Sequence, residues 1–489
     1  MATIVTRSGK GSPLTNTEVD ANFTNLNTGL TPIEGPSSLG SAGQVLTVNS
    51  GASASEWAAA AGGADLYTAN ESSPSNQPSA TGANAVAIGD GAQATGSDSF
   101  ALGENSRSGA TRSTAFAFSN AGGTNSFAAC IGSTSNAKGA LSTNSVAMGK
   151  NATAGGLRSA ALGDEAVTGT SGESAVALGT SYANGTDCFA AAISTNSTAL
   201  GARDTNTIAM GEHCSSSQSN AVAIGSFNVA SDYYSTIIGG FSSSVACSYA
   251  AILGGRDNTI SNFSSQQTGD YSAILGGRDN TVNNNYSVAW GYSNAISGYA
   301  STGGGDNNTV SADYSFATGY YNLISSDADY CFAHGTQTRA TVQGSRVQAA
   351  GRFSVDGDAQ GGQYILRAAT TDATATVLTS AFDLSSAVSA SNVLSAFNNK
   401  CITFSGTIVA MQNGAQSYGS WDIKGLLVND GGTTTLPSSA ITVISNESNW
   451  GITLTADNTI DALFITVTGE ASHNIRWVAN IHTAEVTYA

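Results

Sequence analysis

The stretch Asn84-Ala85-Val86-Ala87-Ile88-Gly89 decides the fold of this chain, because its pattern returns along the sequence at a nearly constant interval. Counted from Gly89 to Gly335 the sequence contains 17 copies, most of them 13 to 17 residues apart. A unit of about fourteen residues cannot bury a core alone, so copies must stack on one another. Clear copies are residues 144–149, 174–179, 220–225, 271–276 and 286–291.

Each copy alternates as a short β-strand does and ends in a turn at its glycine. Val86 and Ile88 face one side of the strand, and Ala85 and Ala87 face the other. We expect one side to line a narrow coil interior and the small residues to let another chain approach closely. Stacked strands lie about 4.8 Å apart, so the copies predict a rod on the order of 80 Å long.

The flanking segments have other patterns, and together they predict four regions. Residues 1–34 form an attachment segment with a short coiled coil, 35–80 small β modules and a linker, 81–340 the repeat shaft, and 341–489 a β-sandwich or jelly-roll tip. In the first region Thr15 and Glu18 form a possible capping box. The heptad seam that follows it consists of Val19, Phe23, Leu26 and Leu30.

The tip is predicted from several alternating segments separated by turn signals, without helix signals. The expected strands are 364–367, 402–409, 421–428, 463–468 and 475–481, and the run Asn429-Asp430-Gly431-Gly432 is an expected turn. The fold class is therefore all-β: a parallel β-roll shaft, trimeric by the resemblance below, with a short N-terminal helical segment and a β-sandwich tip.

Composition excludes several classes of function. Charged residues make up 10% of the chain, and the net charge of −17 disfavours binding to nucleic acid or to an anionic membrane surface. We expect no transmembrane helix and no signal peptide, so that the chain folds in the cytoplasm of the cell that makes it. The six cysteines lie far apart, which favours buried free thiols.

The repeats over residues 81–340 resemble the head of trimeric autotransporter adhesins, whose S-V-A-I-G repeats form a left-handed parallel β-roll. This resemblance implies a homotrimer. The secretion signal and the outer-membrane anchor of that family are not expected here. Two other stretches, Lys10 to Asn27 and Gly43-Gln44-Val45-Leu46 before Trp57, resemble tail fibres of tailed bacteriophages, notably those that infect marine cyanobacteria.

The second resemblance implies a structural protein of the virion tail that binds the host receptor. The N-terminus would join a tail or adaptor protein through the heptad residues. The C-terminus would meet a host surface glycan, such as lipopolysaccharide, or an outer-membrane protein. The candidate receptor contacts are Tyr418, Trp421, Trp450 and Trp477, although tryptophan in a β-sandwich also commonly packs in the core.

Enzyme chemistry is not expected, and neither are a cofactor or a metal. His213 beside Cys214 is the nearest approach to a metal pair, and a structural role is favoured. Asp356, Asp358 and Asp372 keep open the alternative of a tailspike enzyme that degrades polysaccharide, although turn capping suits them better.

Two recurring features of the lower shaft have both a functional and a structural interpretation. The repeated Arg-Asp-Asn turns at 256–258 and 278–280 favour Asx-turn hydrogen bonding over a cation site. A row of tyrosines at one repeat phase favours packing between coils over sugar stacking. This row consists of Tyr234, Tyr249, Tyr271, Tyr286, Tyr299, Tyr314 and Tyr330.

Overall fold

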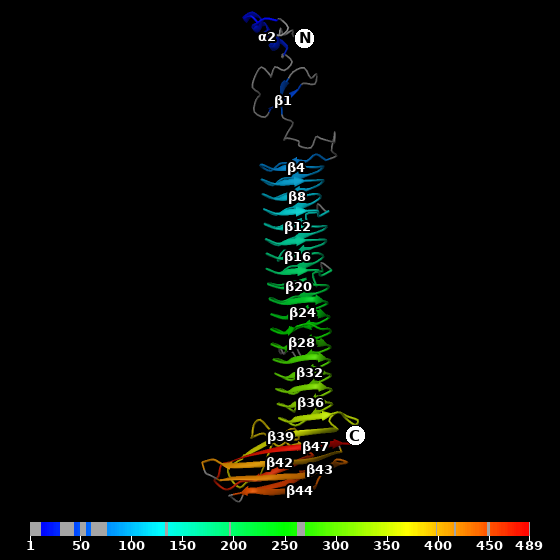
Figure 1. Ribbon diagram of the computed structural model, residues 1–489, viewed down its shortest axis with the longest axis vertical. Helices are drawn as coiled ribbons and strands as arrows, with labels where there is room; N and C mark the ends of the chain where they lie inside the picture. Colours follow the sequence, from blue (N-terminus) through cyan, green and yellow to red (C-terminus); the bar gives the residue numbers. More distant parts are fainter. Residues whose placement is uncertain are drawn as a thin grey trace.

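The structure is a computed structural model that describes residues 11–29, 44–48, 55–59, 76–132, 135–194, 197–261, 269–397, 399–414, 417–446 and 450–488. Near the N-terminus it contains helix α2 (Asn16–Gly29) and a hairpin of β1 (Gln44–Val48) and β2 (Ser55–Ala59). The rest is a long stack of β-coils that ends in a wider β-rich tip (Figure 1). The predicted all-β fold is confirmed.

Every coil of the shaft contributes one strand to each of two parallel sheets. The first, here called the long sheet, consists of β4 (Val86–Ile88), β6 (Phe100–Leu102), β8 (Thr114–Phe116), β10 (Phe127–Ala129), β12 (Val146–Met148), β14 (Ala160–Leu162), β16 (Val176–Leu178), β18 (Phe189–Ala191), β20 (Ile208–Met210), β22 (Val222–Ser226), β24 (Thr236–Phe241), β26 (Ala251–Ile252), β28 (Ala273–Arg278), β30 (Val288–Tyr292), β32 (Thr302–Asp306), β34 (Phe316–Tyr320), β36 (Phe332–Thr336) and β38 (Arg346–Ala350).

The second, the short sheet, is built from two-residue strands. These are β3 (Ser79–Ala80), β5 (Gln93–Ala94), β7 (Arg107–Ser108), β9 (Asn120–Ala121), β11 (Gly139–Ala140), β13 (Thr153–Ala154), β15 (Val167–Thr168), β17 (Tyr182–Ala183), β19 (Gly201–Ala202), β21 (Ser215–Ser216), β23 (Val229–Ala230), β25 (Ser244–Val245), β27 (Thr259–Ile260), β29 (Thr281–Val282), β31 (Ala295–Ile296), β33 (Thr309–Val310), β35 (Leu323–Ile324) and β37 (Arg339–Ala340).

The recurring glycine has a steric reason in this stack. Gly291 has φ +100°, a backbone conformation that disfavours other residues. A Cβ atom added to it would lie 2.1 Å from the carbonyl oxygen of Gly305 in the next coil. The motif therefore ends in glycine because the chain turns there directly against its neighbour.

The side of the repeat strand that faces the coil interior differs from the one expected for its small residues. The central residue of the long-sheet strand points inward, for example Ala147 and Ala161, both completely buried. The larger residues beside it, such as Val146 and Met148, face outward. The prediction that small residues meet another chain was wrong, because the coil is too narrow to hold larger side chains between its two sheets.

The core changes along the shaft. Upper coils are filled mainly by alanine, whereas lower coils contain larger residues such as Ile274, Ile296 and Ile324, all buried. Space for them is made locally: a Cβ atom on Gly303 would lie 2.1 Å from Cδ1 of Ile296. The lower coils therefore bury more apolar surface per coil than the upper ones.

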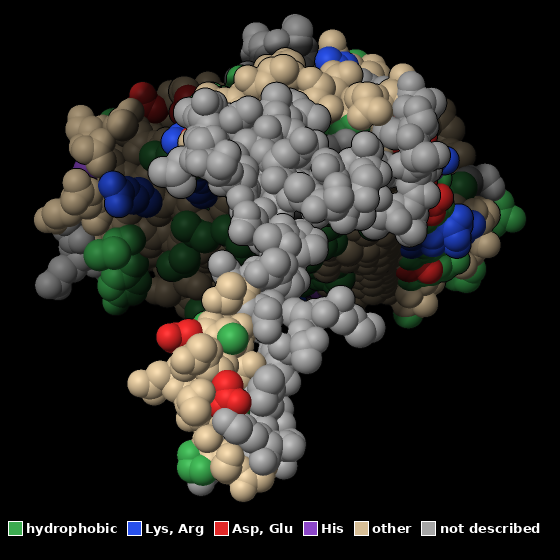
Figure 2. Space-filling model, turned by 90° about the horizontal axis from the view of Figure 1, so that it is seen from above, with side chains coloured by type: hydrophobic (Ala, Val, Ile, Leu, Met, Phe, Trp, Pro, Cys, Tyr) green, Lys and Arg blue, Asp and Glu red, His purple; other side chains and the backbone are tan. Residues whose placement is uncertain are grey.

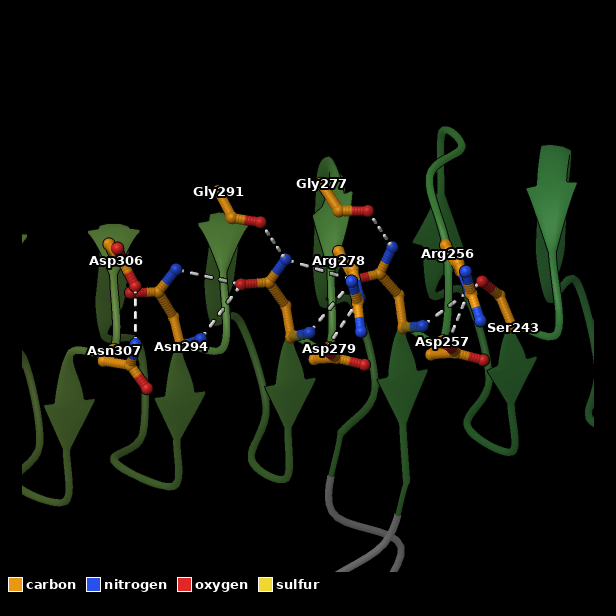
Figure 3. Close-up of polar contacts among 12 residues, drawn as sticks. Ser243, Arg256, Asp257, Gly277, Arg278, Asp279, Gly291, Asn294, Asp306 and Asn307 are labelled. Carbon is orange, nitrogen blue, oxygen red and sulfur yellow. Dashed lines mark hydrogen bonds and ion pairs between the residues drawn. The ribbon is translucent and has the colours of Figure 1, made fainter.

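A ladder of buried asparagines runs through these lower coils. Asn280, Asn294, Asn308 and Asn322 each donate Nδ2 to Oδ1 of the asparagine one coil above, at 2.9–3.0 Å. Their Nδ2 atoms also donate to backbone carbonyls, for example that of Gly291 (Figure 3). Nδ2 of Asn294 likewise donates to Gly305 O. The Asx-turn hydrogen bonds expected for the Arg-Asp-Asn turns are not the ones that their asparagines form: Oδ1 of Asn258 and Oδ1 of Asn280 each accept from the asparagine of the next coil instead.

The tip continues the long sheet rather than starting a separate one. β39 (Ala359–Thr370) pairs antiparallel with β38, and the order then runs β39-β47-β42-β43-β44. In this order, β47 spans Ile475–Thr487, β42 spans Lys400–Gln412 and β43 spans Tyr418–Asp430. The last strand, β44 (Thr433–Asn446), forms the edge of the sheet. Figure 1 shows these strands stacked beneath the last coils.

A second layer completes the sandwich-like tip. It consists of β40 (Thr376–Val377), β41 (Leu394–Ser395), β45 (Gly451–Asp457) and β46 (Ala462–Thr468). All five strands expected from the sequence are present, and residues 429–432 join β43 to β44 as the expected turn. The sequence analysis missed the longer strands β44 and β45 and the two-residue strands β40 and β41. The alternation of Ile452, Leu454 and Ala456 was a usable signal for β45, whereas Pro437 fits β44 only because this is an edge strand.

Candidate functional site

The N-terminal helix begins with the predicted capping box. The backbone N–H of Thr15 donates to Oε2 of Glu18 at 2.8 Å, and the N–H of Glu18 donates to Oγ1 of Thr15 at 3.4 Å. Phe23 is 67% exposed and Val19 is half-buried. The side chain of Leu26 and the whole of Leu30 lie outside the described residues. Of the predicted attachment seam, Phe23 is thus an exposed apolar side chain in the described helix.

The outward side of the long sheet carries two columns of side chains, here called the outer columns. The first contains residues such as Phe100, Val146 and Val288, and the second contains the residues two positions further along each strand. In the second column Ile238, Leu253 and Leu275 are each about half exposed, at 51%, 53% and 53%. Such a long apolar stripe is unusual for the surface of a lone soluble chain.

The end-on view supports this description. Figure 2 shows hydrophobic side chains in green alongside the shaft, while charged side chains are few and scattered around the rim. Both outer columns then change character at the last coils. Below Phe332 the first column continues with Arg346, and below Thr318 the second continues with His334 and Gln348. The second column therefore loses its apolar side chains after Trp290, whereas the first keeps them down to Phe332, next to the tip.

The tyrosine row stacks from coil to coil, as the packing interpretation predicts. Tyr234, Tyr249, Tyr271 and Tyr286 have successive ring centroids 4.8, 4.9 and 5.2 Å apart and nearly parallel planes. One part of the prediction was wrong: Tyr299 is not at the shared phase. The next residue, Ala300, occupies the left-handed turn position that a tyrosine such as Tyr286 occupies in its own coil. The rings of Tyr299 and Tyr286 therefore meet at 71°.

Stacking also limits what this row can bind. Each ring face in the stacked segment is covered by the next ring, so the solvent meets ring edges and hydroxyl groups. Tyr330 continues the row and stacks on Phe382 of the tip, with centroids 5.8 Å apart. Sugar stacking needs a free ring face, and the stacked segment does not provide one between its members.

The four candidate receptor residues separate into two groups. Trp421, Trp450 and Trp477 are 2%, 3% and 1% exposed, and their rings contact one another with centroids 5.6 Å apart. They form the core of the tip, which removes them as contacts for a receptor. Tyr418 is 50% exposed on β43, directly opposite the exposed Met411 of β42. The receptor role stays a prediction for Tyr418.

Two of the three acidic candidates cap a turn. Asp358 accepts hydrogen bonds from the backbone N–H groups of Phe353, Ser354 and Val355 at 2.6–2.8 Å. Burial alone would raise the pKa of Asp358, but these hydrogen bonds lower it on balance. Asp356 instead pairs with Arg352 at 2.6 Å.

Asp372 accepts a hydrogen bond from the N–H of Thr374 at 2.7 Å. The turn-capping interpretation is thus confirmed for Asp358 and Asp372, whereas Asp356 forms an ion pair.

The predicted histidine and cysteine pair points in different directions. The ring of His213 stacks on Phe227 with centroids 4.7 Å apart, whereas Cys214 is buried in the coil. Within the described ranges no three His, Cys, Asp or Glu side chains are grouped closely enough to hold a metal ion. None of the described helices has the length and apolar character needed to cross a membrane.

Four cysteines are buried free thiols, as expected: Cys188, Cys214, Cys247 and Cys331. Burial raises the pKa of the Cys188 thiol to about 11 and that of Cys247 to about 12. The prediction was wrong for Cys130, which is exposed, and Cys401 is half-buried. The buried thiols act as small apolar residues in the coil.

A buried polar network fastens the shaft to the tip. Nζ of Lys400 lies 2.5 Å from Oε2 of Glu485, whose side chain is fully buried. Glu485 also accepts hydrogen bonds from Gln360, Tyr364 and Thr483 at 2.7–3.0 Å. Burial alone would raise the pKa of Glu485, but Lys400 and these hydrogen bonds lower it on balance. Sequence reasoning missed this network, because its members lie up to 125 residues apart.

Comparison with known families agrees with the geometry of the shaft. The YadA head domain repeat matches residues 80–106, 94–116, 140–166 and 216–242. These segments form the upper coils, and the lower coils continue the same stack. The shaft is an adhesin-like β-roll. Its repeats indicate an attachment protein of the adhesin kind. No curated protein matches the chain.

Proposed function

We propose that this chain is a homotrimeric tail fibre of a tailed bacteriophage, a structural protein that attaches the virion to the host surface. The N-terminal helix would join the virion, the shaft would hold the tip at a distance, and the tip would bind a surface glycan or an outer-membrane protein. Its place would be the virion tail, and its role would be binding rather than catalysis.

The observation that carries the proposal is the apolar stripe formed by the outer columns. Fully burying a large aliphatic side chain contributes about 1.5–3 kcal/mol, so covering half-exposed residues such as Leu253 and Leu275 contributes about 1 kcal/mol each. Repeated along the shaft, this gain favours lateral association of identical chains in register. The resemblance to trimeric adhesin heads supplies the number three.

The phage assignment rests on the N-terminal resemblance and on the architecture. The helix with its capping box and exposed Phe23 suits a docking element, and a rigid shaft that continues into a β-rich tip suits a fibre. Three tips on one fibre would bind with avidity, so each contact can be weak.

The association is tested by Leu275→Asp, with Ala295→Asp as the matched control. Leu275 lies in the apolar stripe, whereas Ala295 is exposed on the short sheet of the neighbouring coil. In sedimentation, Leu275→Asp should shift the trimer toward smaller species because it places a charge in an apolar contact. Equal behaviour of the two variants would contradict an interface on the long sheet.

The attachment role is tested by binding of the purified, labelled chain to a panel of intact bacterial strains. The proposal predicts saturable binding to particular strains, weakened by Tyr418→Ala. Phages that grow on those strains should contain the chain in their purified virions by mass spectrometry. Shortening of a surface polysaccharide on incubation would instead favour the tailspike alternative, and binding to no strain would contradict the receptor role.

A further inference from the structure

A polar cavity lies on the outward side of the sheet where the shaft meets the tip. It measures about 640 Å³, and β36, β38, β39 and β47 all contribute to its lining. It occupies the position where the first outer column loses its apolar side chains. Its side chains are unlike those of the stripe above it: His334, Arg346, Gln348, Gln363 and His482.

Strand register places these side chains in two adjoining rows on one face. Arg346 is the direct cross-strand partner of Gln363, which in turn faces His482. In the second row His334 pairs with Gln348, which faces Gly361. Side chains of direct cross-strand partners lie about 5 Å apart at Cβ, so their polar ends converge over the cavity.

Donor groups predominate in this cavity. Arg346 carries a permanent positive charge, and its guanidinium lies over the ring of Phe332, 5.3 Å from the centroid. No described carboxylate forms an ion pair with Arg346. Two of the chain's four histidines line this one cavity, and Nδ1 of His334 is buried without a hydrogen-bond partner among the described atoms. A buried polar atom in this state needs a partner.

The acid that also lines the cavity does not compete for these donors. Glu485 is fully buried, and its carboxylate is held by Lys400 as well as by Gln360, Tyr364 and Thr483. Its charge is therefore neutralised on the inner side of the sheet. The outer side keeps a net positive character in a chain whose overall charge is −17.

We propose that this cavity binds an oxyanion: a phosphate, sulfate or carboxylate group. The planar guanidinium of Arg346 would bind two of its oxygens, and the amides of Gln348 and Gln363 and the imidazoles of His334 and His482 would supply further donors. Gly361 leaves space at the floor because it has no side chain. All of the lining residues come from one chain.

Two sources offer this chemistry: the free ion, and an acidic group on a surface polysaccharide. The test is calorimetric titration of the full-length chain with inorganic phosphate, and separately with a uronic-acid polysaccharide, in chloride-containing Tris buffer. Arg346→Gln should weaken phosphate binding roughly tenfold or more, since it removes the charge and the two-donor fork of the guanidinium. His482→Phe should also weaken it roughly tenfold, since it keeps a ring and removes the N–H donor. Arg112→Gln, at an exposed shaft turn, should leave binding unchanged.

The outcomes separate the alternatives. Phosphate binding that depends on Arg346, without polysaccharide binding, assigns the site to a free ion. Binding of both, with the same dependence, assigns it to an acidic glycan. If the Arg346 variant sediments differently from the parent, His482→Phe alone decides. If neither ligand binds, or if the variants and the parent bind equally well, the proposal is overturned.

Discussion

Replacing Asn294 by alanine should weaken the lower shaft far more than its size suggests. Asn294 donates Nδ2 to Asn280 Oδ1, Trp290 O and Gly305 O at 2.8–3.0 Å. Its own Oδ1 accepts from the backbone N–H and the Nδ2 of Asn308, at 3.0 and 2.9 Å. Every one of these contacts is lost in Asn294→Ala, while the backbone N–H of Asn294 keeps its bond to Asn280.

The magnitude follows from the groups left without partners. The substitution leaves the backbone N–H of Asn308 without its acceptor, which costs about 1–3 kcal/mol. It also removes the other hydrogen bonds of Asn294, worth about 0.5–1.5 kcal/mol each, although Nδ2 of Asn308 keeps Gly304 O and Gly319 O as acceptors. The expected loss of local stability is therefore about 3 kcal/mol. In a stacked repeat each coil depends on its neighbours, so the effect should centre on β30 and β32 and decline with distance.

Hydrogen exchange on the full-length protein measures this loss directly. Amides of β30 and β32 should exchange roughly a hundredfold faster in Asn294→Ala than in the parent, because about 1.4 kcal/mol corresponds to a factor of ten. The control is Thr309→Ala, a half-buried outward residue of the next coil, which should change exchange little. Similar exchange in both variants would refute a stabilising role for the ladder.

Further outcomes follow from the thiols and from the joint between shaft and tip. A thiol reagent at neutral pH should label Cys130 in the folded protein but not Cys188 or Cys247. Burial raises the pKa of the Cys188 thiol to about 11 and that of the Cys247 thiol to about 12, so neither is ionised at neutral pH. Rapid labelling of either buried cysteine would contradict the packed coil. The lowered pKa of Glu485 means that its stabilisation is present above pH 4.5 and is lost as the pH falls through the folded-state value. The protection of β47 amides, measured against exchange of the unfolded chain at the same pH, should therefore fall below pH 4.5, and Glu485→Gln should flatten this dependence. An unchanged pH profile in the variant would count against the network with Lys400.

The repeat spacing was enough to predict the coils, because a short alternating strand with a glycine can be satisfied only by stacking. It did not reveal which side faces inward. Alternation defines two sides equally well, and the narrow coil, rather than hydrophobicity, selects Ala147 over Met148 for the interior. The asparagine ladder also escaped the sequence analysis, although Asn280, Asn294 and Asn308 recur every fourteen residues, a visible sign of side chains stacked in register.

The candidate site was harder to predict for a physical reason. Tryptophan suits both a receptor contact and a sandwich core, and only tertiary packing decides, as it did for Trp421 and Trp477. Lys400 and Glu485 are 85 residues apart in sequence but adjacent in the sheet, and the cavity near Arg346 combines strands from both ends of the tip. No local pattern encodes such long-range pairing.

The central claim is that three chains associate along the apolar stripe of the shaft. Analytical ultracentrifugation of the intact chain tests it most directly, because mass and frictional ratio are read from the same experiment. The account predicts one elongated species at three times the chain mass of 48.9 kDa. A compact monomer, stable across concentration, would contradict it.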